Sequence, residues 1–158
     1  VTTPLLTTAS GAKFGKSAGN AVWLDPEKTS HYDFFQFFVR TEDADVRRLL
    51  LLFTEMPVAE VEAVVAEHEA AVERRVAQRC LAEHVTRLVR GERALQSARR
   101  VSDILFGRAA AAAAAGLDGE DLAALRRHAP CAKLGCGQVV GRSVVDVAVA
   151  AGAVKSKG

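Results

Sequence analysis

The sequence predicts a mainly α-helical fold, and two observations support that prediction. Apolar residues recur at spacings of three and four through residues 81–105, the period at which side chains share one face of an α-helix. Upstream, capping residues and a proline divide residues 28–70 into three shorter helical segments. With 158 residues and a hydrophobic content of 49%, the chain can bury one moderate core. It is short for two full domains.

The chain opens with a loop, residues 11–20, that carries two lysines among small side chains. No acidic residue lies between positions 1 and 24, so Lys13 and Lys16 have no local counter-charge. Small neighbours such as Gly15 and Ser17 let backbone N–H groups approach an anion closely, which favours a phosphate-binding loop. The alternative is a flexible surface turn with two solvated lysines.

This loop is not a nucleotide P-loop. That motif places four residues between its first glycine and the Gly-Lys-Ser sequence, whereas three residues separate Gly11 from Gly15. The residue at position 10, where the glycine should stand, is Ser10.

The first helix is predicted to begin near His31, after a cap at Thr29 or Ser30. Its aromatic residues lie all around the helix, and no basic residue follows them before Arg40. We therefore expect a buried helix rather than a platform for stacked bases. The aromatic residues are Tyr32, Phe34, Phe35, Phe37 and Phe38.

Two further helices are expected before the long helical region. Residues 43–54 form the second, whose predicted buried face holds Val46, Leu49, Leu50 and Phe53. Pro57 suits the first turn of the third, which continues through residues 58–69.

Charge is segregated along the chain, although the net charge is only +2. Residues 41–70 carry a net charge of −6, whereas residues 71–100 hold eight arginines against three glutamates. Residues 71–100 are predicted to be helical, with Leu81, Val85 and Leu88 on one face and Leu95, Ala98 and Leu105 continuing the pattern beyond Gly91. Four arginines share a flank, which is interpreted either as a solvated face or as an RNA-binding face: Arg75, Arg79, Arg87 and Arg90.

The pattern weakens after residue 107. Residues 109–115 are seven alanines, interpreted as a linker or a helix extension. A short amphipathic helix is expected over residues 117–128, ended by Pro130, and a glycine-rich stretch leads to a last helix within residues 143–152. His128, Cys131 and Cys136 could be imagined as metal ligands, but they lack Cys-x-x-Cys spacing and a fourth partner, so no protein-bound metal is predicted.

Three motifs resemble tyrosyl-tRNA synthetases, which are class I aminoacyl-tRNA synthetases. Residues 4–30 are similar to the second ATP signature of that family, in which the bacterial and mitochondrial branch favours the Lys-Phe-Gly-Lys-Ser version present at residues 13–17. The resemblance continues through residues 32–40 and 81–92, and is strong to about residue 107. The family usually has proline at the position of His31.

The resemblance implies the C-terminal part of an α/β class I synthetase. Residues 1–27 then end the catalytic domain with the ATP-signature loop, and residues 28–107 form an α-helical anticodon-binding domain. Residues 108–137 are a linker, and residues 138–158 begin an S4-like RNA-binding domain. The chain starts at Val1 rather than at methionine, and we expect a fragment without the family's other ATP motif and tyrosine pocket, inactive by itself.

The activity implied is that of a tyrosine–tRNA ligase, which forms tyrosyl-adenylate from ATP and tyrosine and transfers the tyrosyl group to tRNA(Tyr). Lys13 and Lys16 match the signature lysines and are the expected catalytic residues, with Gly15 and Ser17 joining them in binding ATP, which enters as Mg-ATP substrate. A homodimer is implied for the full-length enzyme. The alternatives are a non-catalytic RNA-binding helical fragment and another class I synthetase such as the tryptophanyl enzyme.

The compartment is inferred from composition and resemblance. Three cysteines make an odd, sparse set, which suits a reducing compartment, and no apolar run approaches the ~20 residues of a membrane span. The bacterial-type motifs suit either a mitochondrial or a bacterial enzyme, and the residues around Asn20 favour the mitochondrial matrix over the bacterial cytoplasm.

Overall fold

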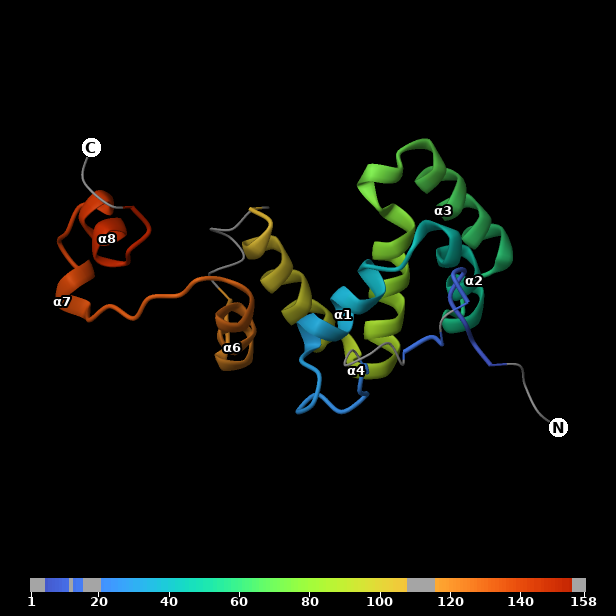
Figure 1. The fold of residues 1–158 in the computed structure, drawn as a ribbon, viewed down its shortest axis with the longest axis horizontal. Helices are drawn as coiled ribbons and strands as arrows, with labels where there is room; N and C mark the ends of the chain where they lie inside the picture. Colours follow the sequence, from blue (N-terminus) through green and yellow to red (C-terminus); the bar gives the residue numbers. More distant parts are fainter. Residues whose placement is uncertain (1–4, 12, 16–20, 108–115, 155–158) are drawn as a thin grey trace.

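The computed structural model describes residues 5–11, 13–15, 21–107 and 116–154, which are mainly helical (Figure 1). Among these residues, β pairing is limited to one isolated antiparallel bridge between Thr7 and Lys13. The prediction of a mainly α fold is therefore confirmed. The helical elements are α1 (His31–Val39), α2 (Asp43–Phe53), α3 (Val58–Ala70), the 3-10 turn η1 (Val72–Arg74), α4 (Val76–Leu105), α6 (Gly119–His128), α7 (Cys136–Val139) and α8 (Val144–Ala150).

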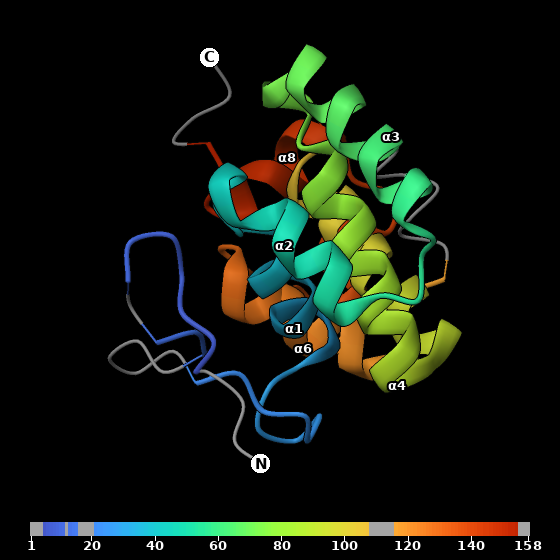
Figure 2. The ribbon, with the colours of Figure 1, turned by 90° about the vertical axis from the view of Figure 1, so that its right-hand side faces the viewer.

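The long helix α4 lies at the centre of a bundle formed with α1, α2, α3 and α6, which we call the helical body. Helices α1, α2, α3 and α6 all pack against α4. Figures 1 and 2 show α2 and α3 beside one half of α4, and α1 between α2 and α6. The main core gathers side chains from α1, α2, α3 and α4, including Phe34, Leu49, Val61 and Leu81.

The first helix forms as its sequence predicts. The Ser30 hydroxyl accepts a hydrogen bond from the Asp33 backbone N–H at 3.1 Å and donates to the Asp33 carboxylate at 2.6 Å, which fixes the helix start at His31. Tyr32 and three of the four phenylalanines of α1 are buried, and Phe37 is half-buried against the same core. Burial raises the pKa of the Tyr32 hydroxyl. The interpretation of these rings as core is confirmed.

Helices α2 and α3 follow their predicted limits closely. Val46, Leu49 and Leu50 are fully buried, and Phe53 packs half-buried against the same core. Pro57 lies one position earlier than expected, at the N-cap of α3 rather than in its first turn. The helix therefore begins at Val58, with the fixed φ of the proline leading into it.

Helix α4 changes direction at Gly91, whose backbone has φ 82° and ψ 172°. Leu81 and Val85 are buried before this break, and Leu95 and Ala98 after it, as the spacing predicts. The prediction for Leu88 is wrong, because its side chain is 62% exposed in the last turn before the break. The spacing of three and four places Leu88 on the same face as Leu81 and Val85, but it does not show that another element covers that face as far as the break at Gly91.

The region predicted as a linker contains a packed helix. Asp118 caps α6 by accepting from the Glu120 and Asp121 backbone N–H groups, both at 2.9 Å. Ala124 and Leu125 then pack on Val101 of α4 and on Tyr32 of α1. The expected helix thus forms over Gly119–His128, two residues later than predicted at its start, and it belongs to the helical body rather than to a spacer. The alanine run at residues 109–115 lies outside the described residues.

The last described segment lies apart from the body. An extended stretch, residues 129–135, leads to α7 and α8, which contact each other at the far end of the molecule (Figure 1). Ser143 caps α8 by accepting from the Asp146 N–H at 3.2 Å, so a helix forms where the sequence predicts one. The S4-like character of this unit stays a prediction. None of the described helices combines the length and apolarity needed to cross a membrane.

Candidate functional site: the lysine hairpin

The predicted phosphate-binding loop overlaps a short hairpin, described over residues 5–11 and 13–15, which we call the lysine hairpin. Its two arms are joined by the bridge between Thr7 and Lys13 and by a hydrogen bond from the Phe14 N–H to the Leu6 carbonyl at 3.0 Å. The turn closes with the Gly11 N–H donating to the Thr8 carbonyl at 2.9 Å. Gly11 has φ +83°, a left-handed conformation that favours glycine.

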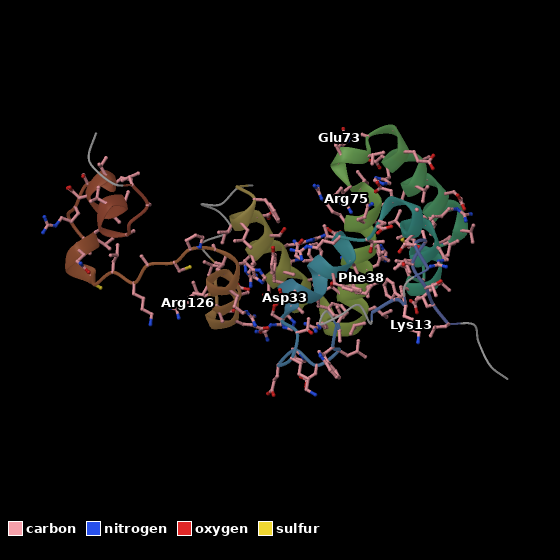
Figure 3. The ribbon with its side chains drawn as sticks, viewed as in Figure 1. Lys13, Asp33, Phe38, Glu73, Arg75 and Arg126 are labelled. Carbon is pink, nitrogen blue, oxygen red and sulfur yellow. The ribbon has the colours of Figure 1, made fainter. Side chains whose placement is uncertain are left out.

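Lys13 is exposed on this hairpin, at the α2 side of the molecule (Figure 3). Gly15 follows two residues later, also with a left-handed φ of +72°. The other two predicted ATP-binding residues, Lys16 and Ser17, lie outside the described residues. The structure therefore places one of the two signature lysines, on a backbone whose direction is set by glycine.

Phe14 anchors the hairpin to the helical body. Its ring meets Phe37 of α1 edge-on at 5.4 Å between centroids and Phe53 of α2 at 5.8 Å. Such aromatic contacts contribute about 0.5–1.5 kcal/mol beyond the burial of area. The sequence Lys-Phe-Gly thus alternates an exposed cation with a docked ring, so the position of Lys13 depends on α1 and α2.

Two residues of α2 that the sequence analysis did not single out also hold the hairpin. The Asp45 carboxylate accepts from the Ala9 N–H at 2.9 Å, and the Arg48 guanidinium donates to the Thr7 carbonyl. Arg48 also pairs with Asp45 at 3.2 Å. The available signal was the register of Asp45, which lies four residues before Leu49 and so places a carboxylate on the apolar face of α2.

A cavity of about 490 Å³ lies between the hairpin and helices α1 and α2. Three cations and three carboxylates line it, so it has no net preference for either sign of charge: Lys13, Lys28 and Arg40 against Asp33, Glu42 and Asp45. Phe14 and Phe37 form part of its apolar wall. Polar and apolar groups therefore meet at the base of the lysine hairpin.

Arg75, one of the arginines predicted to contact tRNA, is built into the fold. It precedes α4 with a left-handed φ of 51°. Its guanidinium donates to the Val39 carbonyl at 3.0 Å and to the Thr41 carbonyl at 2.7 Å, the groups left open at the end of α1. Lys13 and Arg75 lie well apart (Figure 3).

Arg90 is likewise packed against the helical body, where it is half-buried. Its guanidinium stacks over the Phe34 ring at 4.2 Å and donates to the Trp23 carbonyl at 2.9 Å. Burial lowers the pKa of Arg90. The prediction of one arginine flank is therefore corrected: Arg75 and Arg90 satisfy backbone carbonyls rather than face solvent, because open carbonyls lie within their reach.

The other two predicted arginines are Arg87 and Arg79. Arg87 is exposed and pairs with Glu92 at 2.8 Å. Arg79 lines a second cavity, of about 610 Å³, beside α4. Arg99 also pairs with Glu83 at 2.7 Å, inside the same basic segment, whereas Arg100 pairs with Asp121 of α6 at 2.8 Å and so has a counter-charge from outside residues 71–100.

The histidine weighed as a metal ligand has a protein partner. His128 Nε2 lies 2.7 Å from an Asp33 carboxylate oxygen, and its ring contacts Tyr32. Cys131 and Cys136 are exposed. In the part of the chain that the structure describes, no cluster of three or more His, Cys, Asp or Glu residues is arranged to hold a metal ion.

The sequence model of a family described as "tRNA synthetases class I (W and Y)" matches residues 1–107. A tyrosine–tRNA ligase of Laribacter hongkongensis is 43% identical over 99% of this chain, and one of Anaeromyxobacter dehalogenans strain 2CP-C is 46% identical over the whole chain. This chain spans about a third of the length of these curated relatives, 36% and 37% respectively.

Solved structures give the same likeness. A C-terminally truncated mitochondrial tyrosyl-tRNA synthetase of Coccidioides posadasii is 44% identical, with a TM-score of 0.53 over 62% of this chain and 25% of that chain. The mitochondrial enzyme of Aspergillus nidulans, also C-terminally truncated, is 38% identical with a TM-score of 0.53 over 55% of this chain. The relatives therefore include bacterial and mitochondrial proteins, and the curated bacterial ones do not support the mitochondrial assignment in particular.

Proposed function

Because the chain belongs to the class I aminoacyl-tRNA synthetase family of the tryptophan and tyrosine enzymes, we propose that it is part of a tyrosine–tRNA ligase. The observation that carries the proposal is the Lys-Phe-Gly-Lys-Ser loop, with Lys13 exposed on a hairpin that Phe14 docks to the helical body. The relatives that match nearly the whole chain are named for tyrosine, which favours tyrosine over tryptophan as the amino acid.

In this proposal, the loop stabilises negative charge on ATP. Tyrosine attacks the α-phosphate, tyrosyl-adenylate forms, and pyrophosphate leaves with its charge spread over non-bridging oxygens. Lys13 and Lys16 offer ammonium groups to that charge, and the Ser17 hydroxyl and the backbone at Gly15 offer further donors. ATP arrives as Mg-ATP, and these residues contribute electrostatic stabilisation without forming a covalent bond to the substrate.

The proposed partners are tRNA(Tyr), tyrosine and a second copy of the full-length protein. Of the arginines offered for tRNA contact (Arg75, Arg79, Arg87 and Arg90), Arg87 ranks first because its side chain is exposed, whereas Arg75 and Arg90 are engaged with backbone carbonyls. Such contacts would act through phosphate charge rather than base edges. The same engagement makes a purely RNA-binding role the weaker candidate. The mitochondrial matrix stays a prediction.

The test is Lys16→Ala in the full-length enzyme, compared with Lys133→Ala. We expect the tyrosine-dependent exchange of pyrophosphate into ATP to fall by about 10²–10³-fold in Lys16→Ala, the size of effect seen when one charge-stabilising donor is removed, while the KM for tyrosine changes little. Lys133 is a suitable control because it is an exposed lysine of the extended stretch 129–135 and does not line the cavity beside the lysine hairpin. Exchange at the wild-type rate in Lys16→Ala would remove that residue from the mechanism.

A further inference from the structure

Asp45 and Arg48 of α2 both contact the backbone of the lysine hairpin, Arg48 in its first arm and Asp45 in its turn. The Asp45 carboxylate accepts from the backbone N–H of Ala9 at 2.9 Å, and the Arg48 guanidinium donates to the backbone carbonyl of Thr7. The two side chains also pair with each other at 3.2 Å. Together they form a closed set of contacts, which we call the α2 clamp.

The clamp joins parts of the chain that are far apart in sequence. Ala9 and Asp45 are 36 residues apart, and Thr7 and Arg48 are 41 apart. Asp45 is 4% exposed, and a buried carboxylate is retained at low cost only where it is paired and hydrogen-bonded. Both of its oxygens have such partners, one on the hairpin and one on Arg48.

The backbone that the α2 clamp holds is directly linked to the exposed Lys13. Thr7, whose carbonyl takes the Arg48 hydrogen bond, is the residue that bridges to Lys13 across the hairpin. On the other side of Lys13, Phe14 is docked on Phe37 and Phe53. The backbone of Lys13 is therefore fixed from both sides by contacts to α1 and α2, while its side chain stays exposed.

We propose that Asp45 and Arg48 are positioning residues for adenylate formation, acting by fixing the hairpin that carries Lys13 and leads into Lys16. The inference rests on the proposed function, because it assigns to α2 the placement of the loop that meets ATP. A positioned cation stabilises developing charge without reorganising, so a looser hairpin lowers the rate of the chemical step. Neither residue is placed at the substrate itself.

The chain offers a matched pair of variants. Arg47 and Arg48 are neighbours of similar side-chain exposure, 53% and 46%, but Arg47 pairs with Glu62 of α3 rather than with the hairpin. Replacing either with methionine keeps an apolar stem on the helix surface. Arg48→Met removes the hydrogen bond to Thr7, and Arg47→Met leaves the clamp whole.

The experiment measures two quantities in the full-length enzyme. Hydrogen exchange of the hydrogen-bonded hairpin amides, those of Ala9, Gly11 and Phe14, should be about tenfold faster in Arg48→Met and unchanged in Arg47→Met, with the α4 amides as an internal reference. The single-turnover rate of tyrosyl-adenylate formation should fall about tenfold in Arg48→Met, with the KM for tyrosine unchanged. Arg48→Lys, which keeps a multi-donor cation, should recover part of that rate.

Each outcome has a separate meaning. Faster exchange with a slower chemical step supports the positioning role. Unchanged hairpin exchange in Arg48→Met overturns the clamp, and faster exchange with a wild-type rate overturns the positioning role by making the clamp purely structural. Full activity of Lys16→Ala would instead overturn the proposed function, whatever the exchange data show for Arg48.

Discussion

The fully buried carboxylate of Asp121 holds α6 on the helical body, so Asp121→Ala is expected to release that helix. One carboxylate oxygen accepts from Arg100 Nε and Nη2 at 3.0 and 2.8 Å and from the Asp118 N–H at 3.2 Å, and the other accepts from the Ser97 hydroxyl. The change removes all of these contacts together. It also breaks the reciprocal cap at the start of α6.

The expected magnitude follows from these contacts. Losing the charge-assisted bonds to Arg100 costs about 1.5–3 kcal/mol, and losing the cap costs about 0.5–2 kcal/mol. The Arg100 side chain is 28% exposed, so water can hydrate part of the freed guanidinium. The total loss of stability of α6 should therefore lie near 3 kcal/mol, which corresponds to about a hundredfold increase in its open-to-closed ratio.

Hydrogen exchange of the amides in α6 measures this ratio directly. Glu120→Ala is the matched control, because Glu120 is the preceding residue, is exposed, and makes an ion pair with His31 at 3.4 Å. An exposed pair of this kind contributes about 0–1 kcal/mol. Equal exchange in the two variants, or a change below tenfold in Asp121→Ala, would refute the reasoning.

Two further predictions concern titratable groups. The hydrogen bond from Arg47 lowers the pKa of Glu62 below its usual 4.5, so the pair stabilises the fold above that pH and its contribution disappears as the pH falls through the lowered value. The difference in urea midpoint between wild type and Arg47→Met should therefore shrink below pH 4.5, and a constant difference would contradict this. Burial raises the pKa of the Cys80 thiol, which also lies 3.7 Å from the Met56 sulfur. Iodoacetamide should modify Cys80 more slowly than the two exposed cysteines at pH 8, and equal rates by mass spectrometry would be evidence against it.

The helices of the body were predictable where local signals agree. The Ser30 cap, the aromatic residues of α1 and the Val46–Leu49–Leu50 spacing in α2 each depend on residues within about one helical turn. The lysine loop was predictable for a different reason, since its residue types and their order are themselves the signal. Its attachment to α2 was not, because the hydrogen bonds join residues 36 and 41 positions apart.

Long-range contacts also explain why the roles of Arg75 and Arg90 and the packing of α6 could not be predicted from the sequence. Arg75 and Arg90 add to a basic run in the sequence, yet their partners are carbonyls at Val39, Thr41 and Trp23, and a charge count takes no account of carbonyls. Asp121 looks like a surface residue of a short helix, and its burial depends on Arg100 being opposite it. In both cases the deciding atom is supplied by another helix or loop.

Gly91 has a consequence for which substitutions the chain can accept. The residue is exposed, and a Cβ built there meets nothing within 4 Å, so space does not restrict it. Its φ of 82° and ψ of 172° fall in a region that is essentially glycine-only, so handedness alone excludes every L-side chain. Solvent exposure and mutational tolerance, which usually rise together, are therefore uncoupled at this one position. Substitutions should therefore be accepted at exposed positions of α4 on either side of Gly91, while position 91 should remain glycine.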